Sequence, residues 1–128
     1  MSGKEILVDT NIILYLLSGN IDLENFLQGK ILYVSFITEL ELIGYKNSTE
    51  EQDQDIKEFL SDCSVISLSD KIKSEYVNLK RKYKIKLPDA VVASTAIALN
   101  IPLITADSDF RNINELVMIS YTHGIDLI

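Results

Sequence analysis

The chain has 128 residues, of which 47% are hydrophobic, so it can bury the core of one compact domain, expected over residues 1–128. No apolar run reaches the ~18 residues of a membrane span, no signal peptide is recognisable before the first strand, and the lone Cys63 cannot form an intrachain disulfide, which together favour a cytoplasmic protein with no membrane partner. The net charge of −7 argues against a general nucleic-acid coating protein, but it is compatible with a nucleic-acid enzyme that has a local basic patch.

Runs of strand length alternate with helical periodicity along the chain. The first strand, Ile6–Val8, ends at Asp9, and a helix follows from Ile12. Residues 48–52 carry a capping-box signature that opens another helix. The other expected elements are strands at 31–36, 64–69, 102–107 and 116–121 and helices at 38–45, 70–86 and 88–100. Because such alternation implies right-handed crossovers, we predict a three-layer α/β/α sandwich with a central, mostly parallel sheet.

Acidic residues recur where the strands end and the helices begin. Asp9 ends the first strand, Glu39 lies early in the helix after the second, Asp89 follows Pro88 at a helix start, and Asp107 ends the strand at 102–107. Because ligands of a parallel sheet bind beyond the carboxyl ends of its strands, we expect these four acids at one edge of the sheet.

Helix capping explains Glu39 or Asp89 taken singly, because acidic residues are favoured in the first turn of any helix. All four together would repel one another unless they are protonated or bridged by cations, and some should have raised pKa values. Mg²⁺ and Mn²⁺ prefer such oxygen ligands, so the sequence favours a metal site with one or two cations.

The residues around these acids resemble the PIN domain family, and most of all the VapC-type toxins of toxin–antitoxin pairs. The matching segments are Leu7–Ile12, Ser35–Leu42 and Leu87–Phe110, and their order and spacing extend over nearly the whole chain. The resemblance implies the α/β/α fold and metal-dependent cleavage of RNA. It also implies a homodimer and neutralisation by a small antitoxin whose tail inserts near the acidic pocket.

The resemblance assigns site residues position by position. Asp109 falls where relatives are often acidic or amide, which implies an auxiliary or outer ligand. Polar positions beside the acids are matched by Asn11, Ser35 and Thr105, whose amide or hydroxyl could orient a carboxylate or a metal-bound water, although turn or cap bonding explains them as well. The acidic quartet itself is matched by Asp9, Glu39, Asp89 and Asp107.

The remaining chemistry agrees with a metal mechanism. His123 is the one histidine, so a nuclease with two histidines as acid and base is excluded, and no glycine-rich phosphate loop or nucleophile elbow is present. We expect metal-activated water as the nucleophile, with Asp9 and Asp89 as direct ligands. Glu39 and Asp107 would complete the site, and one of them could hold or deprotonate the water.

A basic run precedes the third acid. Of the 12 Lys and Arg residues, seven lie between Lys71 and Lys86. Phosphates of RNA could be neutralised by Lys82, Lys84 and Lys86, and Tyr83 could stack on an unpaired base. Compensation of a helix dipole explains the same lysines equally well.

Alternatives from other classes are weaker. A phosphate-transferring domain with an aspartate nucleophile would need a second acid where Asn11 stands, and a phospho-accepting receiver domain would need a lysine after its last strand. A housekeeping RNA-processing PIN nuclease and a catalytically silent PIN module for binding or dimerisation both stay open.

Overall fold

The computed structural model describes residues 3–122, so His123 lies outside the described residues. Its sheet has five parallel strands in the order β3-β2-β1-β4-β5, with β1 at the centre. The strands are β1 (Glu5–Val8), β2 (Ile31–Ser35), β3 (Ser64–Ile66), β4 (Leu103–Thr105) and β5 (Met118–Ser120). The predicted α/β architecture is confirmed, and every strand pairing is parallel.

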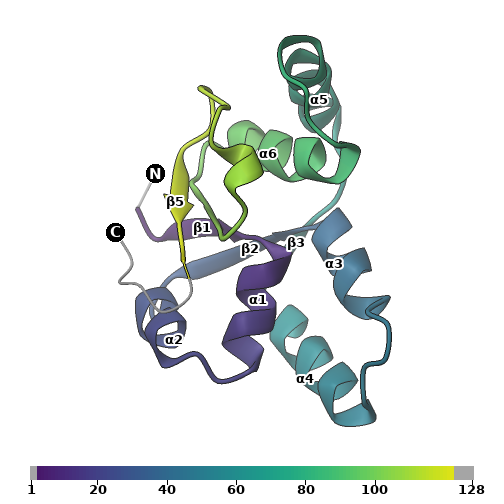
Figure 1. Ribbon diagram of the computed structural model, residues 1–128, viewed down its shortest axis with the longest axis vertical. Coiled ribbons are helices and arrows are strands. Elements are labelled where there is room, and N and C mark those ends of the chain that lie inside the picture. Colours follow the sequence, from purple (N-terminus) through teal and green to yellow (C-terminus); the bar gives the residue numbers. More distant parts are fainter. Residues whose placement is uncertain (1–2, 123–128) are drawn as a thin grey trace.

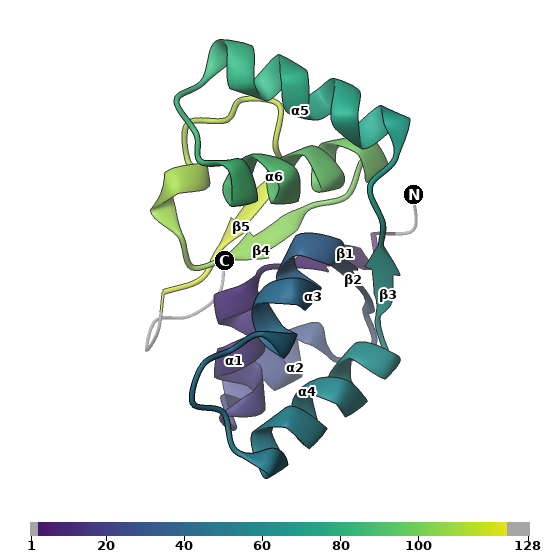
Figure 2. The same cartoon turned by 90° about the vertical axis from the view of Figure 1, so that its right-hand side faces the viewer.

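Helices cover both faces of the sheet (Figures 1 and 2). One side carries α1 (Thr10–Leu17), α2 (Ile21–Leu27), α3 (Phe36–Ile43) and α4 (Glu50–Ser61), and the other carries α5 (Asp70–Lys82) and α6 (Leu87–Leu99). Side chains of β1 alternate between the two faces, as a pleated strand requires. Ile6 and Val8 pack with the first group of helices, whereas Leu7 packs with the second.

The helix starts use local capping. Thr49 and Gln52 form the expected reciprocal capping box at the start of α4. Ser35 caps α3 directly after β2, so this helix begins at Phe36, two residues before the expected start. The basic helix α5 ends at Lys82, four residues before the expected end, and leaves residues 83–86 as a connection to α6.

One helix was not expected from the sequence. In α2, the side chain of Asn20 accepts a hydrogen bond from the backbone N–H of Leu23, and Leu23 and Leu27 are buried. A seven-residue helix gives only two turns of periodicity, which is too little to distinguish it from a loop.

The carboxyl ends of β1 and β4 meet at one edge of the sheet. Pairing continues past the end of β1, because the backbone N–H of Asp9 donates to the carbonyl of Ile104 in β4 at 3.1 Å. Asp9 and the end of β4 are therefore neighbours in space, although 96 positions separate Asp9 from Thr105 in sequence. Within residues 3–122, no helix is long and apolar enough to span a membrane.

Candidate functional site

Asp9 lies at the centre of this edge and is only 9% exposed. It is the N-cap of α1, where its Oδ1 accepts a hydrogen bond from the backbone N–H of Thr10 at 2.9 Å. Its Oδ2 accepts a hydrogen bond from the hydroxyl of Thr105 at 2.6 Å. Both carboxylate oxygens therefore have a fixed donor, which explains how the end of a core strand can hold a buried carboxylate.

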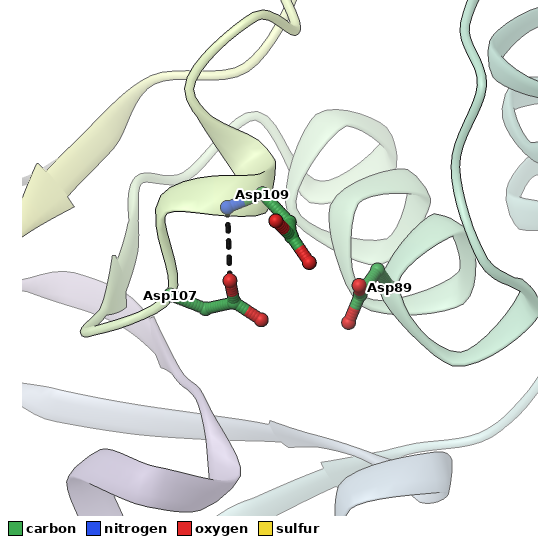
Figure 3. A group of neighbouring side chains, drawn as sticks. All are labelled: Asp89, Asp107 and Asp109. Atoms are coloured by element: carbon green, nitrogen blue, oxygen red, sulfur yellow. Dashed lines mark hydrogen bonds between the residues drawn. The ribbon is translucent and has the colours of Figure 1, made fainter.

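Three further aspartates lie together beside it (Figure 3). Carboxylate oxygens of Asp89, Asp107 and Asp109 lie within 4.8 Å of one another. Asp89 projects from the first turn of α6, Asp107 directly precedes the short 3₁₀ helix η1 (Ser108–Phe110), and Asp109 lies within η1. Asp107 caps η1 by accepting a hydrogen bond from the backbone N–H of Asp109 at 2.8 Å. Each acid is thus held by a helix start rather than by a free loop.

Burial and mutual repulsion disfavour the ionised forms of these acids. The pKa of Asp89 is raised from 3.8 to about 6, chiefly by desolvation and then by the negative charges of Asp107, Asp9 and Asp109, while Lys86 opposes the shift. Desolvation also raises the pKa of Asp9, against the hydrogen bonds that it accepts. The expectation of raised pKa values in the metal-free site is confirmed for these two residues.

Among the acidic residues of α3, Glu41 is the one that interacts with Asp9 and its neighbour Thr10. The hydroxyl of Thr10 donates a hydrogen bond to Oε1 of Glu41 at 2.6 Å, and the negative charge of Glu41 contributes to the raised pKa of Asp9. Glu39, the residue expected from the sequence, lines a hollow between α3 and α4 with Asp53 and Lys57. Sequence reasoning therefore missed Glu41 as a candidate.

The three polar positions beside the acids have different surroundings. Thr105 contacts Asp9 directly, and its hydroxyl oxygen also accepts the backbone N–H of Asp107 at 3.0 Å. Ser35 is fully buried and caps α3 through the backbone N–H of Ile37 at 3.3 Å, which is an ordinary capping role. Asn11 is exposed in the first turn of α1.

Replacing Thr105 with valine is expected to destabilise the protein by about 1.5–3 kcal/mol, the usual value of a hydrogen bond to a charged group, and to raise the pKa of Asp9 further. Unfolding in denaturant measures the loss, and Thr105→Ser, which keeps the hydroxyl, is the control. Equal stability of the valine and serine variants would show that the hydroxyl has no such role.

The residues of the basic run fall into two groups with different contacts. Lys82 forms a 2.6 Å salt bridge with Glu115, and the hydroxyl of Tyr83 donates to the same carboxylate at 2.6 Å. Lys84 and Lys86 instead line a hollow of about 480 Å³ together with Asp89 and Asp109. The two lysines that precede α6 are therefore the ones beside the acidic cluster.

This donor set fits a hard divalent cation. Four carboxylates converge from the end of β1, the start of α6, the β4–η1 connection and η1, and carboxylate oxygens are preferred by Mg²⁺ and Mn²⁺. Among the described residues the cluster contains no histidine or cysteine, so nothing in it favours zinc or copper.

Comparison with known proteins gives the PIN domain family, which the sequence motifs resemble. The PIN domain profile matches residues 6–116. A chain of the toxin–antitoxin complex from Klebsiella pneumoniae is 34% identical with a TM-score of 0.74, covering 88% of this chain and 95% of that one. VapBC-1 from nontypeable Haemophilus influenzae is 29% identical with a TM-score of 0.75, covering 91% and 97%. VapBC2 from Rickettsia felis, bound to a promoter DNA fragment, is 24% identical with a TM-score of 0.81, covering 92% and 99%.

No curated protein matches the chain significantly. The profile match covers far more than half of the chain, including β1 from its second residue, all of β2, β3 and β4, and every aspartate of the acidic cluster. The chain belongs to the PIN domain family.

Proposed function

We propose that the protein is a metal-dependent endoribonuclease that hydrolyses phosphodiester bonds of RNA with a metal-activated water. The observation that carries this proposal is the group of Asp89, Asp107 and Asp109, whose oxygens lie within 4.8 Å of one another next to buried Asp9. Repulsion among these acids destabilises the folded protein when no cation is bound. A metal site that cleaves phosphodiesters uses such a group of carboxylates.

Each residue has a proposed role. Asp9, Asp89 and Asp107 hold Mg²⁺ or Mn²⁺, and Asp109 is an auxiliary ligand. When bound, the cation lowers the pKa of a coordinated water and stabilises charge on the phosphate. Thr105 keeps Asp9 in place through its 2.6 Å hydrogen bond. A further acid from α3 orients the attacking water or accepts its proton; the contact with Thr10 favours Glu41 in this role, and Glu39 is the alternative from the sequence.

We further propose that the nuclease is the toxin of a type II toxin–antitoxin system, works as a homodimer, and is neutralised by a small antitoxin. The support is the likeness to the toxin–antitoxin complex from Klebsiella pneumoniae, whose chain is 34% identical over most of its length. A housekeeping PIN nuclease would share the chemistry without the antitoxin. A silent binding module would have no use for four crowded acids, two with raised pKa values.

The test is cleavage of single-stranded RNA by the purified protein. We expect cleavage in millimolar Mg²⁺ or Mn²⁺, complete loss in EDTA, and recovery when the cation is restored in excess. The Asp9→Asn protein, purified in the same way, controls for contaminating nucleases and should be inactive. RNA cleavage that persists in EDTA, or in the Asp9→Asn preparation, would show that the proposed mechanism is wrong.

A further inference from the structure

A hollow of about 480 Å³ opens beside the acidic cluster, between the connection that precedes α6 and the segment around η1. This volume lies within the ~300–1,000 Å³ of typical small-molecule sites. Two of its lining residues, Asp89 and Asp109, belong to the acidic cluster. A molecule in the hollow would therefore adjoin any group held by the aspartates.

Hydrogen bonds fix the walls of this hollow. Nζ of Lys80 donates to the carbonyl of Ile85 at 2.7 Å, which ties the connection to the end of α5. The hydroxyl of Tyr83 donates to Glu115 and accepts the backbone N–H of Asn114 at 3.2 Å. The connection is thereby joined to the segment after η1, so the hollow is part of the fold rather than a gap between loose loops.

The hollow pairs positive charge with the acids. Lys84 and Lys86 line it, and neither forms an ion pair with another residue among residues 3–122. The charge of Lys86 acts on Asp89, because it lowers the pKa of that acid against the other contributions. An anion that bridges the two lysines would thus lie next to the aspartates. Lys82 is different, since Glu115 already neutralises it.

The remaining wall offers neutral hydrogen-bonding groups. Ser108 and Asn112 line the hollow, and within the described part of the chain neither side chain has a hydrogen-bond partner. A carboxamide presents a donor and an acceptor side by side, which matches the edge of an unpaired base. The hollow therefore combines phosphate neutralisation with one group able to distinguish bases.

We propose that this hollow is a nucleotide subsite of the site described above, occupied by the nucleotide next to the scissile phosphate of single-stranded RNA. Lys84 and Lys86 neutralise its phosphate, and Asn112 hydrogen-bonds to its base and sets a base preference at that position. This inference rests on the proposed ribonuclease function.

The phosphate contact is tested by salt titration of RNA binding. The probe is a fluorescein-labelled 12-nucleotide RNA, and all variants carry Asp9→Asn so that nothing is cut. Lys84→Gln is expected to flatten the dependence of log affinity on log salt by about 0.7, the value for one single-strand phosphate contact. Lys57→Gln, on α4 away from the hollow, is the matched control and should keep the slope. An unchanged slope in Lys84→Gln would refute the contact.

The base contact is tested with oligouridine, oligocytidine and oligoadenosine of equal length. The Asp9→Asn protein is expected to prefer one of them by about tenfold, and Asn112→Ala should reduce the spread to about twofold. Asn114→Ala, which removes the same group two residues further on, should keep the preference. Equal affinity for all three RNAs before mutation, or an unchanged spread in Asn112→Ala, would refute the assignment of Asn112.

Cleavage by the unmodified protein distinguishes failure of the nucleotide subsite from failure of the proposed ribonuclease function. If it cuts RNA in Mg²⁺ while Lys84→Gln and Asn112→Ala bind as their parent does, the subsite is wrong and the ribonuclease proposal stands. If the unmodified protein neither binds nor cuts RNA, both are wrong.

Discussion

Replacing Asp89 with asparagine is expected to abolish RNA cleavage and, at the same time, to stabilise the metal-free protein. The amide keeps the shape of the side chain but removes its charge from the group of three aspartates. Loss of a residue that only supports a metal ligand costs about 10–100-fold, so loss of a direct ligand should cost more than about a hundredfold. If the protein is a toxin, the same substitution should relieve growth arrest.

The gain in stability follows from the raised pKa of Asp89. Between its unfolded value of 3.8 and its folded value of about 6, the folded chain binds the proton more tightly than the unfolded chain does. Stability of the metal-free protein should therefore fall as pH rises through this window, and remain lower above it. Since Asp89 is half-buried and screened by solvent, we expect the asparagine variant to be more stable by only about 1–2 kcal/mol at pH 7.

Thermal unfolding in EDTA from pH 4 to pH 8 measures this effect. The two proteins should melt together near pH 4 and separate as pH rises, with the asparagine variant higher. Mg²⁺ should raise the melting temperature of the unmodified protein and have less effect on the variant. Asp55→Asn, an exposed residue of α4, is the control for cleavage and should keep full activity. A variant that melts earlier at pH 7, or still cuts RNA, would contradict the cation-site model.

Much of the fold could be predicted because its signals are local. Each of the first four strands is a short, largely apolar run that ends near a helix start, and alternation of the two predicts a parallel sheet. The edge at which Asp9, Asp89 and Asp107 meet then follows from topology, since parallel strands end on the same side. The short helix α2 was missed because only Leu23 and Leu27 mark its buried face.

The side-chain partners could not be predicted, because they depend on contacts between segments far apart in sequence. The sequence around Lys82 and Tyr83 does not indicate that both side chains donate hydrogen bonds to Glu115, which lies 32 or more residues away. Their predicted contact with RNA now requires loss of these bonds, whereas Lys84 and Lys86 lie beside the acids. The Thr105 hydroxyl donates a hydrogen bond to Asp9 and accepts one from the backbone N–H of Asp107. The bond to Asp9 likewise depends on the pairing of β1 with β4.

Helical periodicity in the sequence also does not decide whether Glu39 or Glu41 faces the acidic cluster. Successive helical residues are about 100° apart, so these two side chains point roughly 200° apart. Buried Thr38 and Leu42 mark the inner stripe of α3, and the two glutamates flank it on opposite sides. Sequence periodicity identifies the stripe but not which flank faces Asp9. Only the placement of α3 on the sheet decides this.

Glu41→Gln is therefore expected to reduce RNA cleavage more strongly than Glu39→Gln, by about a hundredfold relative to the unmodified protein if Glu41 handles the attacking water. The glutamine keeps an oxygen that can accept the hydrogen bond from Thr10, so the fold should persist. Because the charge of Glu41 helps to raise the pKa of Asp9, its removal should also lower that pKa. NMR titration of the Asp9 carboxyl carbon in the metal-free protein measures this independently of activity. The reverse order of cleavage losses, with the Asp9 titration unchanged in Glu41→Gln, would assign the handling of the attacking water to Glu39.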